Sequence, residues 1–398
     1  MKIVDVRPVN VAFPERPAAK GTSPNWHSYM PRGLPMNRFE DFPPTLPGLT
    51  PGFRGREVWV KVTAEDGSFG LGRCSFGAPV ASLVAQDFAA LLVGRDALAT
   101  EFLNGLMWEA SRRYGITGHA AVAVSGVDLA LWDLKGKLLE QPVYRLLGGP
   151  SRSRIPLYAT TNDIEWALEL GFTSIKLPNE VHWSQGLDGL HRLEEQAARS
   201  REIVGPSVDL MLNPVMCFDV EFAIRVAEIL KRYGFRWMEE PLVPDNIRGL
   251  GTIRQAVPGL AIATGEDHHT RYPFLEMLRT GVVDIVQPDI QWCGGLSELV
   301  RIDTLAEAHG IKTVPHAAAN TPFGQHALAA LLNCPLGEFH ISSDVGVPLD
   351  QGHLIPGTAA PVGGWLEVSD APGFGIEVQA DWITDWTPAE PADGGSFY

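Results

Sequence analysis

The sequence predicts an α/β protein built around a parallel (β/α)8-type barrel. Between Asn213 and Glu338 one pattern recurs: a short apolar run, a polar residue where the run ends, then a stretch with helical spacing. The polar residues lie about 22 to 27 positions apart, which is the length of one strand, one helix and two short loops. They are Asn213, Glu239, Glu266, Asp289, His316 and Glu338. Because all strands of such a barrel end at one face, these side chains are expected to meet in one pocket, as in an enzyme.

The elements before this repeat predict a smaller N-terminal domain. Residues 1–12 and 57–72 alternate like antiparallel strands, with a hairpin turn at 64–67, and residues 80–145 have helical spacing. The Gly-Gly-Pro run that ends at Pro150 marks a domain boundary. We predict an N-terminal domain over 1–135, a barrel over 136–350 and a tail over 351–398 that returns to the N-terminal domain.

Two further features complete the predicted organisation. Apolar runs at 155–159 and 174–177 are the first two barrel strands and precede the six that end in polar residues. Residues 14–55 are rich in proline and too long for a simple connection. This segment is either a floppy excursion or an ordered lid over a site, since long loops in compact enzymes are often functional.

Composition limits the classes of protein and partner. The chain has 398 residues with 45% hydrophobic and 20% charged content, which fits a large core plus a second domain and excludes a disordered chain. A net charge of −15 argues against a nucleic-acid partner. The N-terminus is typical of a strand and not of a signal peptide, and no apolar run approaches the roughly 20 residues that span a membrane. Four widely spaced cysteines suggest neither a zinc site nor a disulfide framework. We expect a cytoplasmic protein with no membrane partner.

Three of the strand-end residues carry hard oxygen donors. Asn213, Glu239 and Glu266 end three successive predicted strands and can converge on one hard cation, for which Mg²⁺ is the expected ion. Any one of them alone is explained equally well as a helix N-cap or a turn residue.

The next two strand ends predict an acid–base pair. Neighbouring strands bring Asp289 within reach of the imidazole of His316, which fixes its tautomer and raises its basicity. A core histidine with satisfied hydrogen bonds is the alternative. Removing a proton next to a carboxylate produces an ene-diolate, whose charge a metal and hydrogen-bond donors stabilise.

At these residues the chain resembles the enolase superfamily, in its mandelate racemase/muconate lactonizing enzyme branch, and within it the rhamnonate-type acid-sugar dehydratases. The most specific match is the run Gln-Pro-Asp-Ile-Gln-Trp-Cys-Gly-Gly at 287–295. The other matching segments are 127–133, 146–149, 237–241, 264–266, 314–316 and 372–376. The resemblance covers nearly the whole chain.

The resemblance implies a fold and a set of roles. The fold is a (β/α)7β barrel, a modified TIM barrel, with an N-terminal α+β capping domain. Glu239 and Glu266 are implied as Mg²⁺ ligands, with Asn213 at the position of the first of the family's three ligands. Asp289 and His316 form the dyad that removes the α-proton. Glu338 hydrogen-bonds the substrate carboxylate or the intermediate.

Three positions depart from the family pattern. Asn213 stands where the first metal ligand is normally Asp, so the site loses a charge. Asp267 stands where rhamnonate-type sequences tend to carry His, which partly restores that charge. Pro178 stands where racemases of the family need a second lysine, so the base on the opposite face is missing.

The candidates for substrate contacts are His27, Arg54, Lys176, Asp267 and His268.

The sequence therefore predicts Mg²⁺-dependent dehydration of a sugar acid, an aldonate of the rhamnonate kind, to its 2-keto-3-deoxy acid. An acid-sugar epimerase or cycloisomerase is the alternative among enzymes, and the missing second lysine weakens it. A non-catalytic scaffold with a degenerate metal site is the alternative of another class. The expected partner is a small-molecule acid sugar, and we expect a homo-oligomer.

Overall fold

A computed structural model describes residues 1–14, 19–28, 35–38, 57–352 and 354–387 of the chain. Its N-terminal part is an antiparallel sheet in the order β13-β1-β2-β3. The strands are β1 (Ile3–Val11), β2 (Val58–Ala64), β3 (Phe69–Cys74) and β13 (Ile383–Asp385). Because β13 comes from the end of the chain and pairs with β1 from Val9 to Val11, the tail completes this sheet, as predicted.

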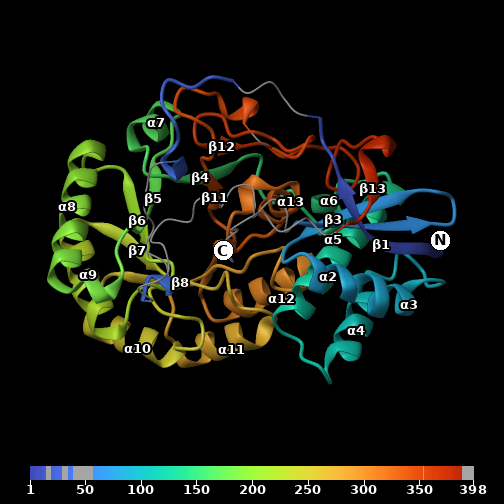
Figure 1. Cartoon of the computed structure of the whole chain (residues 1–398), viewed down its shortest axis with the longest axis horizontal. Coiled ribbons are helices and arrows are strands. Elements are labelled where there is room, and N and C mark those ends of the chain that lie inside the picture. The colour runs from blue at the N-terminus through green and yellow to red at the C-terminus, as the bar shows by residue number, and fades with distance from the viewer. Residues whose placement is uncertain (15–18, 29–34, 39–56, 353, 388–398) are drawn as a thin grey trace.

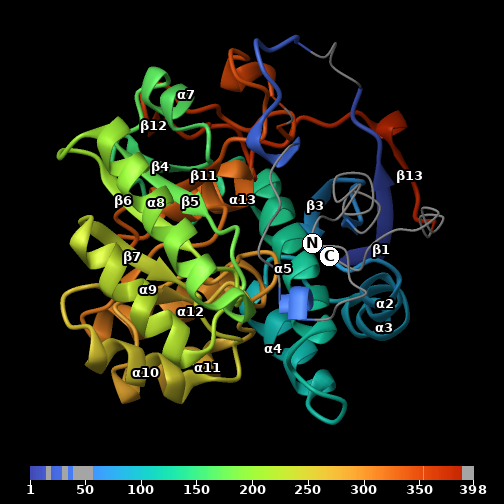
Figure 2. The same cartoon turned by 60° about the vertical axis from the view of Figure 1, so that its left-hand side comes forward.

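Helices cover this sheet. They are α2 (Ala78–Ser82), a π-helical turn (Leu83–Phe88), α3 (Ala89–Leu92), α4 (Thr100–Ser111), α5 (His119–Leu138) and α6 (Val143–Leu146). Helix α5 is buried along most of its length and lies between the antiparallel sheet and the barrel (Figure 2). A Cβ on Gly70 or Gly72 of β3 would overlap carbonyl oxygens of α5, so these glycines allow the close approach of helix and strand.

The second part is a curled parallel sheet with helices on its outer side (Figure 1). The parallel strands are β4 (Ile155–Thr160), β5 (Ser174–Pro178), β6 (Asp209–Asn213), β7 (Phe235–Glu239), β8 (Ala261–Thr264), β9 (Ile285–Val286), β10 (Lys312–Thr313) and β11 (Gly337–His340). The helices between them are α7 (Ile164–Glu169), α8 (Gly186–Val204), α9 (Val220–Arg232), α10 (Ile247–Ala256), α11 (Arg271–Thr280), α12 (Gly295–Ala308) and α13 (Pro322–Ala330).

The sheet order follows the chain from β4 to β10, and the last strand, β11, returns to pair with β4. A short strand, β12 (Trp365–Leu366), adds to β4 in antiparallel direction. The predicted class, an α/β barrel with an N-terminal capping domain, is confirmed. The exact (β/α)7β count stays a prediction, because β9 and β10 are only two residues long.

The core of the barrel is built from inward-facing side chains of successive strands. Tyr158, Met211, Trp237, Ala263 and Val314 form one buried cluster in its interior. A layer of this kind makes the barrel a packed core and leaves the carboxyl ends of the strands as the place for chemistry.

The helix ends follow local sequence signals. Asp219 caps α9 by accepting a hydrogen bond from the backbone N–H of Phe222 at 2.8 Å. Thr321 caps α13 in the same way, with Pro322 at the first helical position. Gly281 ends α11 in the left-handed conformation that favours glycine.

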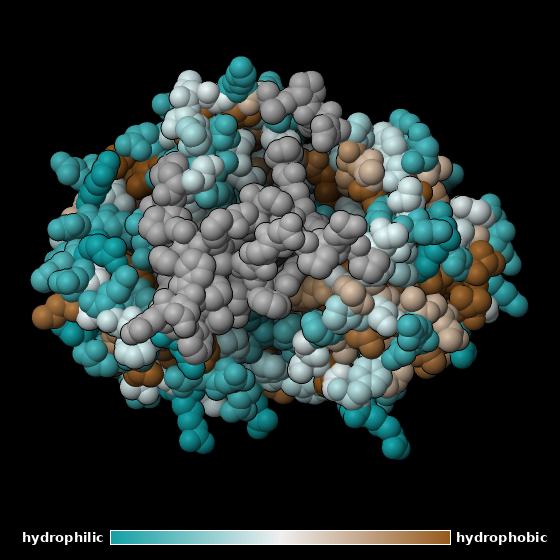
Figure 3. Space-filling view, viewed as in Figure 1, coloured by the Kyte–Doolittle hydropathy of each residue, from teal (hydrophilic) through white to brown (hydrophobic). Residues whose placement is uncertain are grey.

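The domain limits at 135 and 350 stay predictions, and α5 continues across the first of them to Leu138. Within the described residues no helix is long and apolar enough to cross a membrane. Hydrophilic residues predominate on the described surface of the face in Figure 3, with apolar residues interspersed.

Candidate active site

A cavity of about 430 Å³ lies at the carboxyl ends of the barrel strands. Its described lining includes residues of the N-terminal part, among them Trp26, His27 and Arg73, and residues of the barrel. The barrel contributes Asn213, Glu266, Asp289 and His316, which are four of the six predicted strand-end residues. The N-terminal part and the barrel therefore both contribute residues to the lining of this cavity.

Asp289 and His316 form the predicted pair. Nδ1 of His316 lies 2.8 Å from Oδ2 of Asp289, and the other carboxylate oxygen accepts the backbone N–H of Gln291 at 2.6 Å. An ionised carboxylate only accepts, so Nδ1 carries the proton. Nε2 lies 3.6 Å from Oε1 of Glu266, on the cavity side. This arrangement orients a ring nitrogen for proton transfer.

The surrounding carboxylates control the charge of His316. Burial alone would lower its pKa, but the charge of Glu266, the hydrogen bond that His316 donates to Asp289 and the charge of Glu338 outweigh burial and raise the pKa well above its usual value. The imidazolium is therefore the favoured form while these carboxylates lack another counter-charge.

A buried ion cluster lies beside the dyad. The ammonium of Lys176, 1% exposed, contacts Oε1 of Glu239 and lies 2.6 Å from Oε1 of Glu338. Glu338 also accepts hydrogen bonds from the hydroxyl of Thr160 at 2.5 Å and from the backbone N–H of Ala317 at 2.8 Å. Burial opposes charge on Lys176, yet the glutamates raise its pKa above the usual value. The same ammonium helps to hold the pKa of Glu338 well below its usual range, against the effect of burial.

Hydrogen-bond donors surround the carboxylate of Glu239. Oε1 accepts from Lys176 and, at 3.0 Å, from the amide nitrogen of Asn213. Oε2 accepts from the indole N–H of Trp237 at 3.1 Å and from the amide of Gln287 at 2.6 Å. Both oxygens are thus engaged by protein donors.

A second group of carboxylates lies next to it. One oxygen each of Glu240, Glu266 and Asp267 lie within 4.8 Å of one another. Burial and the neighbouring charges raise the pKa of all three, that of Glu266 to about 8. Glu240 is 2% exposed, and its Oε1 has no hydrogen-bond partner among the described residues. A hard divalent cation fits this donor set, because it supplies the counter-charge that these oxygens lack.

The comparisons with known proteins agree with this geometry. The sequence profile of the enolase C-terminal domain-like family matches residues 161–382. The profile of the mandelate racemase/muconate lactonizing enzyme N-terminal domain matches residues 52–148. The chain belongs to the mandelate racemase/muconate lactonizing enzyme family of the enolase superfamily.

Several members of this family are similar over most of their length. An L-rhamnonate dehydratase from Saccharopolyspora erythraea is 39% identical over 334 residues, which cover 81% of this chain and 83% of the relative. The crystal structure of L-rhamnonate dehydratase from Gibberella zeae superposes with a TM-score of 0.84 at 30% identity and covers 96% and 94% of the two chains. A structure of rhamnonate dehydratase from the same organism, complexed with Mg, has a TM-score of 0.83 at 30% identity and covers 96% and 95%.

Of the five residues that the sequence predicts as substrate contacts, one lines the cavity and the others do not or lie outside the described residues. His27 lines the cavity, with its ring 3.7 Å from that of Trp26. Lys176 is engaged in the buried ion cluster, and Asp267 belongs to the carboxylate group next to it. His268 is 6% exposed, packs on Phe274 and is not among the described residues that line the cavity. Arg54 lies outside the described residues.

Sequence reasoning missed two residues of this site. Glu240 follows Glu239 directly, and its φ of 33° is unusual for a residue other than glycine. His340 lines the cavity, with Nε2 3.2 Å from Oε1 of Glu338 and its ring 5.7 Å from that of His316. A signal for His340 was present: Glu338 was predicted as the end of its strand, but β11 continues to His340, and residues two apart on a strand point to the same side.

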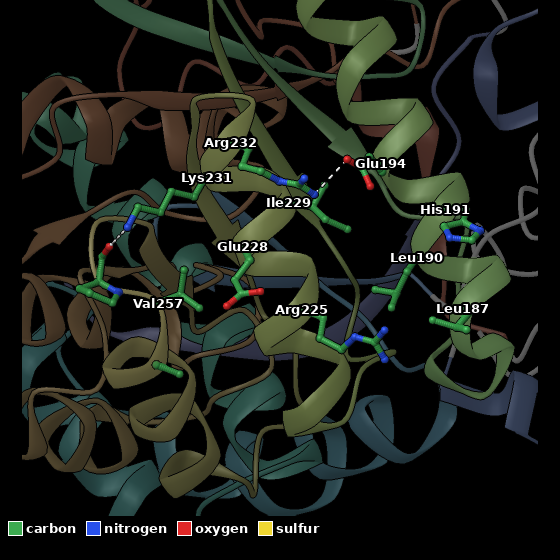
Figure 4. Close-up of a pocket in the computed structure, with 12 residues that line it drawn as sticks. Leu187, Leu190, His191, Glu194, Arg225, Glu228, Ile229, Lys231, Arg232 and Val257 are labelled. Carbon is green, nitrogen blue, oxygen red and sulfur yellow. Dashed lines mark hydrogen bonds and ion pairs between the residues drawn. The ribbon is translucent and has the colours of Figure 1, made fainter.

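A larger hollow of about 820 Å³ lies on the outer side of the barrel, between α8, α9 and the end of α10 (Figure 4). Its described lining includes Leu187, His191 and Arg225, together with an ion pair of 2.9 Å between Arg232 and Glu194. None of the predicted strand-end residues is in that lining. The smaller cavity at the strand ends is therefore the candidate active site.

Proposed function

We propose that this protein is a Mg²⁺-dependent dehydratase that converts a sugar acid, with L-rhamnonate as the first candidate, to its 2-keto-3-deoxy acid. The observation that carries the proposal is the dyad: His316 is held by Asp289 through Nδ1 and presents Nε2 to a cavity with a carboxylate group beside it. The names of the relatives from Saccharopolyspora erythraea and Gibberella zeae support the choice of substrate class.

Nε2 of neutral His316 accepts the proton from C2, next to the substrate carboxylate. Asp289 stabilises the imidazolium that forms. The imidazolium then gives its proton to the C3 hydroxyl, the C3–O bond breaks and water leaves. The enol that remains loses the proton of its C2 hydroxyl, takes up a proton at C3 and becomes the 2-keto-3-deoxy acid. Mg²⁺, when bound, supplies positive charge that stabilises the negative charge developing on the substrate carboxylate.

A single base fits the rest of the cavity. Pro178 lines it at the position where a second lysine would act in a racemase. Lys176, whose ammonium lies in the ion cluster beside the dyad, is ion-paired with two glutamates that raise its pKa, so it is held protonated and is a poor base. We therefore favour elimination over epimerisation at C2. A homo-oligomeric state and a cytoplasmic location stay predictions.

The test is a screen of purified protein against a library of aldonic and related acids, with chemical detection of 2-keto-3-deoxy product. We expect product from an L-rhamnonate-like acid with added Mg²⁺, and none after treatment with EDTA. Proton NMR of the same reaction in deuterium oxide follows C2. Formation of the C2 epimer without dehydration would show the alternative activity, and no reaction with any acid would support a non-catalytic scaffold.

A further inference from the structure

We propose that His340 is a further substrate-binding residue, whose Nδ1 accepts a hydrogen bond from the C3 hydroxyl of the sugar acid. The inference rests on the proposed function and deepens it, because this hydroxyl is the leaving group of the proposed reaction. His340 is the last residue of β11, two positions after Glu338, and it lines the cavity.

Asn320 fixes the backbone of His340 from a short helical turn, Ala318–Asn320. The side-chain oxygen of Asn320 accepts the backbone N–H of His340 at 2.8 Å, and its amide nitrogen donates to the carbonyl oxygen of His340 at 3.0 Å. Neither bond involves the side chain at position 340. Substitutions of His340 are therefore expected to leave the end of β11 in place.

Glu338 orients the ring of His340. Nε2 is buried and lies 3.2 Å from Oε1 of Glu338, an electrostatic contact whose geometry is not that of a hydrogen bond. The ammonium of Lys176, 2.6 Å from the same oxygen, favours the ionised form of Glu338. Burial lowers the pKa of His340 although Glu338 opposes this shift, so the ring is neutral near pH 7. A carboxylate beside Nε2 favours the tautomer with its proton there, which leaves the lone pair on Nδ1.

The other edge of the ring belongs to the cavity. The side chain of His340 is 29% exposed although Nε2 is buried, so the edge with Nδ1 is the one that meets the cavity. Within the described residues no hydrogen bond to Nδ1 is found. An acceptor of this kind in the wall of a cavity can bind a ligand hydroxyl.

The position of His316 identifies the hydroxyl. The rings of His316 and His340 meet edge to face, with their centroids 5.7 Å apart. A ring nitrogen of one lies within 4.8 Å of a ring nitrogen of the other. One oxygen atom can therefore lie at a hydrogen-bond distance of about 2.8 Å from both. In the proposed reaction the oxygen that must reach His316 is that of the C3 hydroxyl. A hydrogen bond from this hydroxyl to His340 turns a lone pair of the oxygen toward His316, and the hydroxyl keeps its own proton when it leaves as water.

Two amide substitutions separate the two ring nitrogens in an experiment. The side-chain amide of Asn takes roughly the place of Nδ1, and that of Gln reaches the place of Nε2. His340→Asn therefore keeps an acceptor for the hydroxyl and loses the contact with Glu338, His340→Gln does the reverse, and His340→Leu loses both. Calorimetry measures binding of L-rhamnonate with Mg²⁺ to full-length protein that carries His316→Asn, so that the acid is not consumed. His191→Leu, on the exposed face of α8, is the control.

We expect His340→Gln and His340→Leu to raise the Kd of L-rhamnonate at least about fivefold, and His340→Asn and the control to raise it less than about twofold. The 3-deoxy analogue of L-rhamnonate lacks the C3 hydroxyl. It should bind to all these proteins with affinities that agree within about twofold, because the lost contact does not exist for it.

The order of the affinities decides the proposal. Binding by His340→Gln that equals or exceeds that of His340→Asn overturns it, because His340 would then act through Glu338. An equal loss for the 3-deoxy analogue also overturns it. Unfolding curves identify a His340→Leu protein that fails to fold, in which case the two amide variants decide.

Turnover of L-rhamnonate by the wild-type protein is a separate readout. Dehydration together with the wrong order of affinities keeps the proposed function and overturns the contact. The expected order without turnover keeps the contact and overturns the function. Absence of L-rhamnonate binding to the His316→Asn protein and to the wild type overturns both.

Discussion

At the scale of single residues, His316 and Lys176 differ in what their positive charges do. His316 and Lys176 lie among the same carboxylates, and each has a pKa above its usual value. Lys176 is enclosed between two glutamates, and its charge is structural. His316 keeps Nε2 toward the cavity, 3.6 Å from Glu266, and its charge can change during a reaction. We therefore expect replacement of His316 to lower activity and replacement of Lys176 to lower stability.

Replacing His316 by Asn is expected to lower turnover of the identified sugar acid more than about 100-fold, the usual contribution of a general base. The metal affinity should change little, because the lost group acts on a proton. Steady-state rates and Mn²⁺ binding of the same preparation test this. The matched control is His191→Asn, on the exposed face of α8. A variant that keeps more than about a tenth of the wild-type rate would remove His316 from the mechanism.

Replacing Lys176 by Met is expected to lower the free energy of unfolding by about 3–5 kcal/mol, because two buried carboxylates lose their counter-charge. Urea unfolding in EDTA measures this without a contribution from bound metal. The comparison is Arg236→Met, which breaks an ion pair with Asp209 whose side chains are 45% and 49% exposed. That change should cost less than about 1 kcal/mol. Equal losses in the two variants would contradict a structural charge at Lys176.

At the scale of elements, helix α5 fixes the position of the antiparallel sheet relative to the barrel. Glycines on β3 allow the contact on one side of the helix. On the other side Asp128 of α5, fully buried, accepts the backbone N–H of Ser297 in α12 at 2.9 Å. The cavity is lined by residues from both parts. The position of this helix therefore determines where the N-terminal lining residues lie relative to the dyad.

Gly72→Ala is expected to destabilise the protein by about 1–3 kcal/mol or more, because the new methyl group would overlap the carbonyl oxygen of Gly126 in α5. Gly105→Ala is the control: it lies in helix α4 with open space around the new methyl group. That change should stabilise the protein by about 0.5–1 kcal/mol. Thermal unfolding of both variants checks the pair, and a neutral Gly72→Ala would mean that the sheet and α5 can separate.

At the scale of the whole molecule, buried histidines outside the cavity make stability depend on pH. His326 of α13 is 1% exposed, and its Nδ1 accepts the backbone N–H of Tyr144 at 3.2 Å. Its ring also contacts that of Phe374 in the C-terminal tail. Burial lowers the pKa of His326 to about 3. Protonation would therefore break a contact between distant parts of the chain.

The sign of the effect follows from the two pKa values. In the unfolded chain a histidine has a pKa of about 6.5, so below that pH the unfolded state takes up a proton that the folded state does not. The contribution of His326 is complete above about pH 6.5 and is lost as the pH falls toward 3. Between pH 7 and 5 the loss is about 2 kcal/mol.

His326→Gln should remove this dependence while keeping an acceptor for Tyr144. Urea unfolding at pH 7 and pH 5 is the measurement, and the difference between wild type and variant cancels the other histidines. We expect the wild type to lose about 2 kcal/mol more than the variant between these values. Parallel curves for the two proteins would show that His326 is accessible to protons in the folded state.

The sequence alone determined the barrel, because apolar runs, polar strand ends and helical spacing are local patterns that the chain repeats. It also predicted that the side chains of Asp289 and His316 lie together, since these residues follow neighbouring strands and strand ends meet at one face. Only the tertiary structure decided which carboxylate oxygens lack a partner: the sequence pattern selected Glu239 and passed over Glu240, whereas hydrogen bonds from distant residues engage Glu239 and leave one oxygen of Glu240 unpartnered among the described residues. Hydrogen-bond partners depend on side-chain directions and burial, which spacing along a chain does not fix.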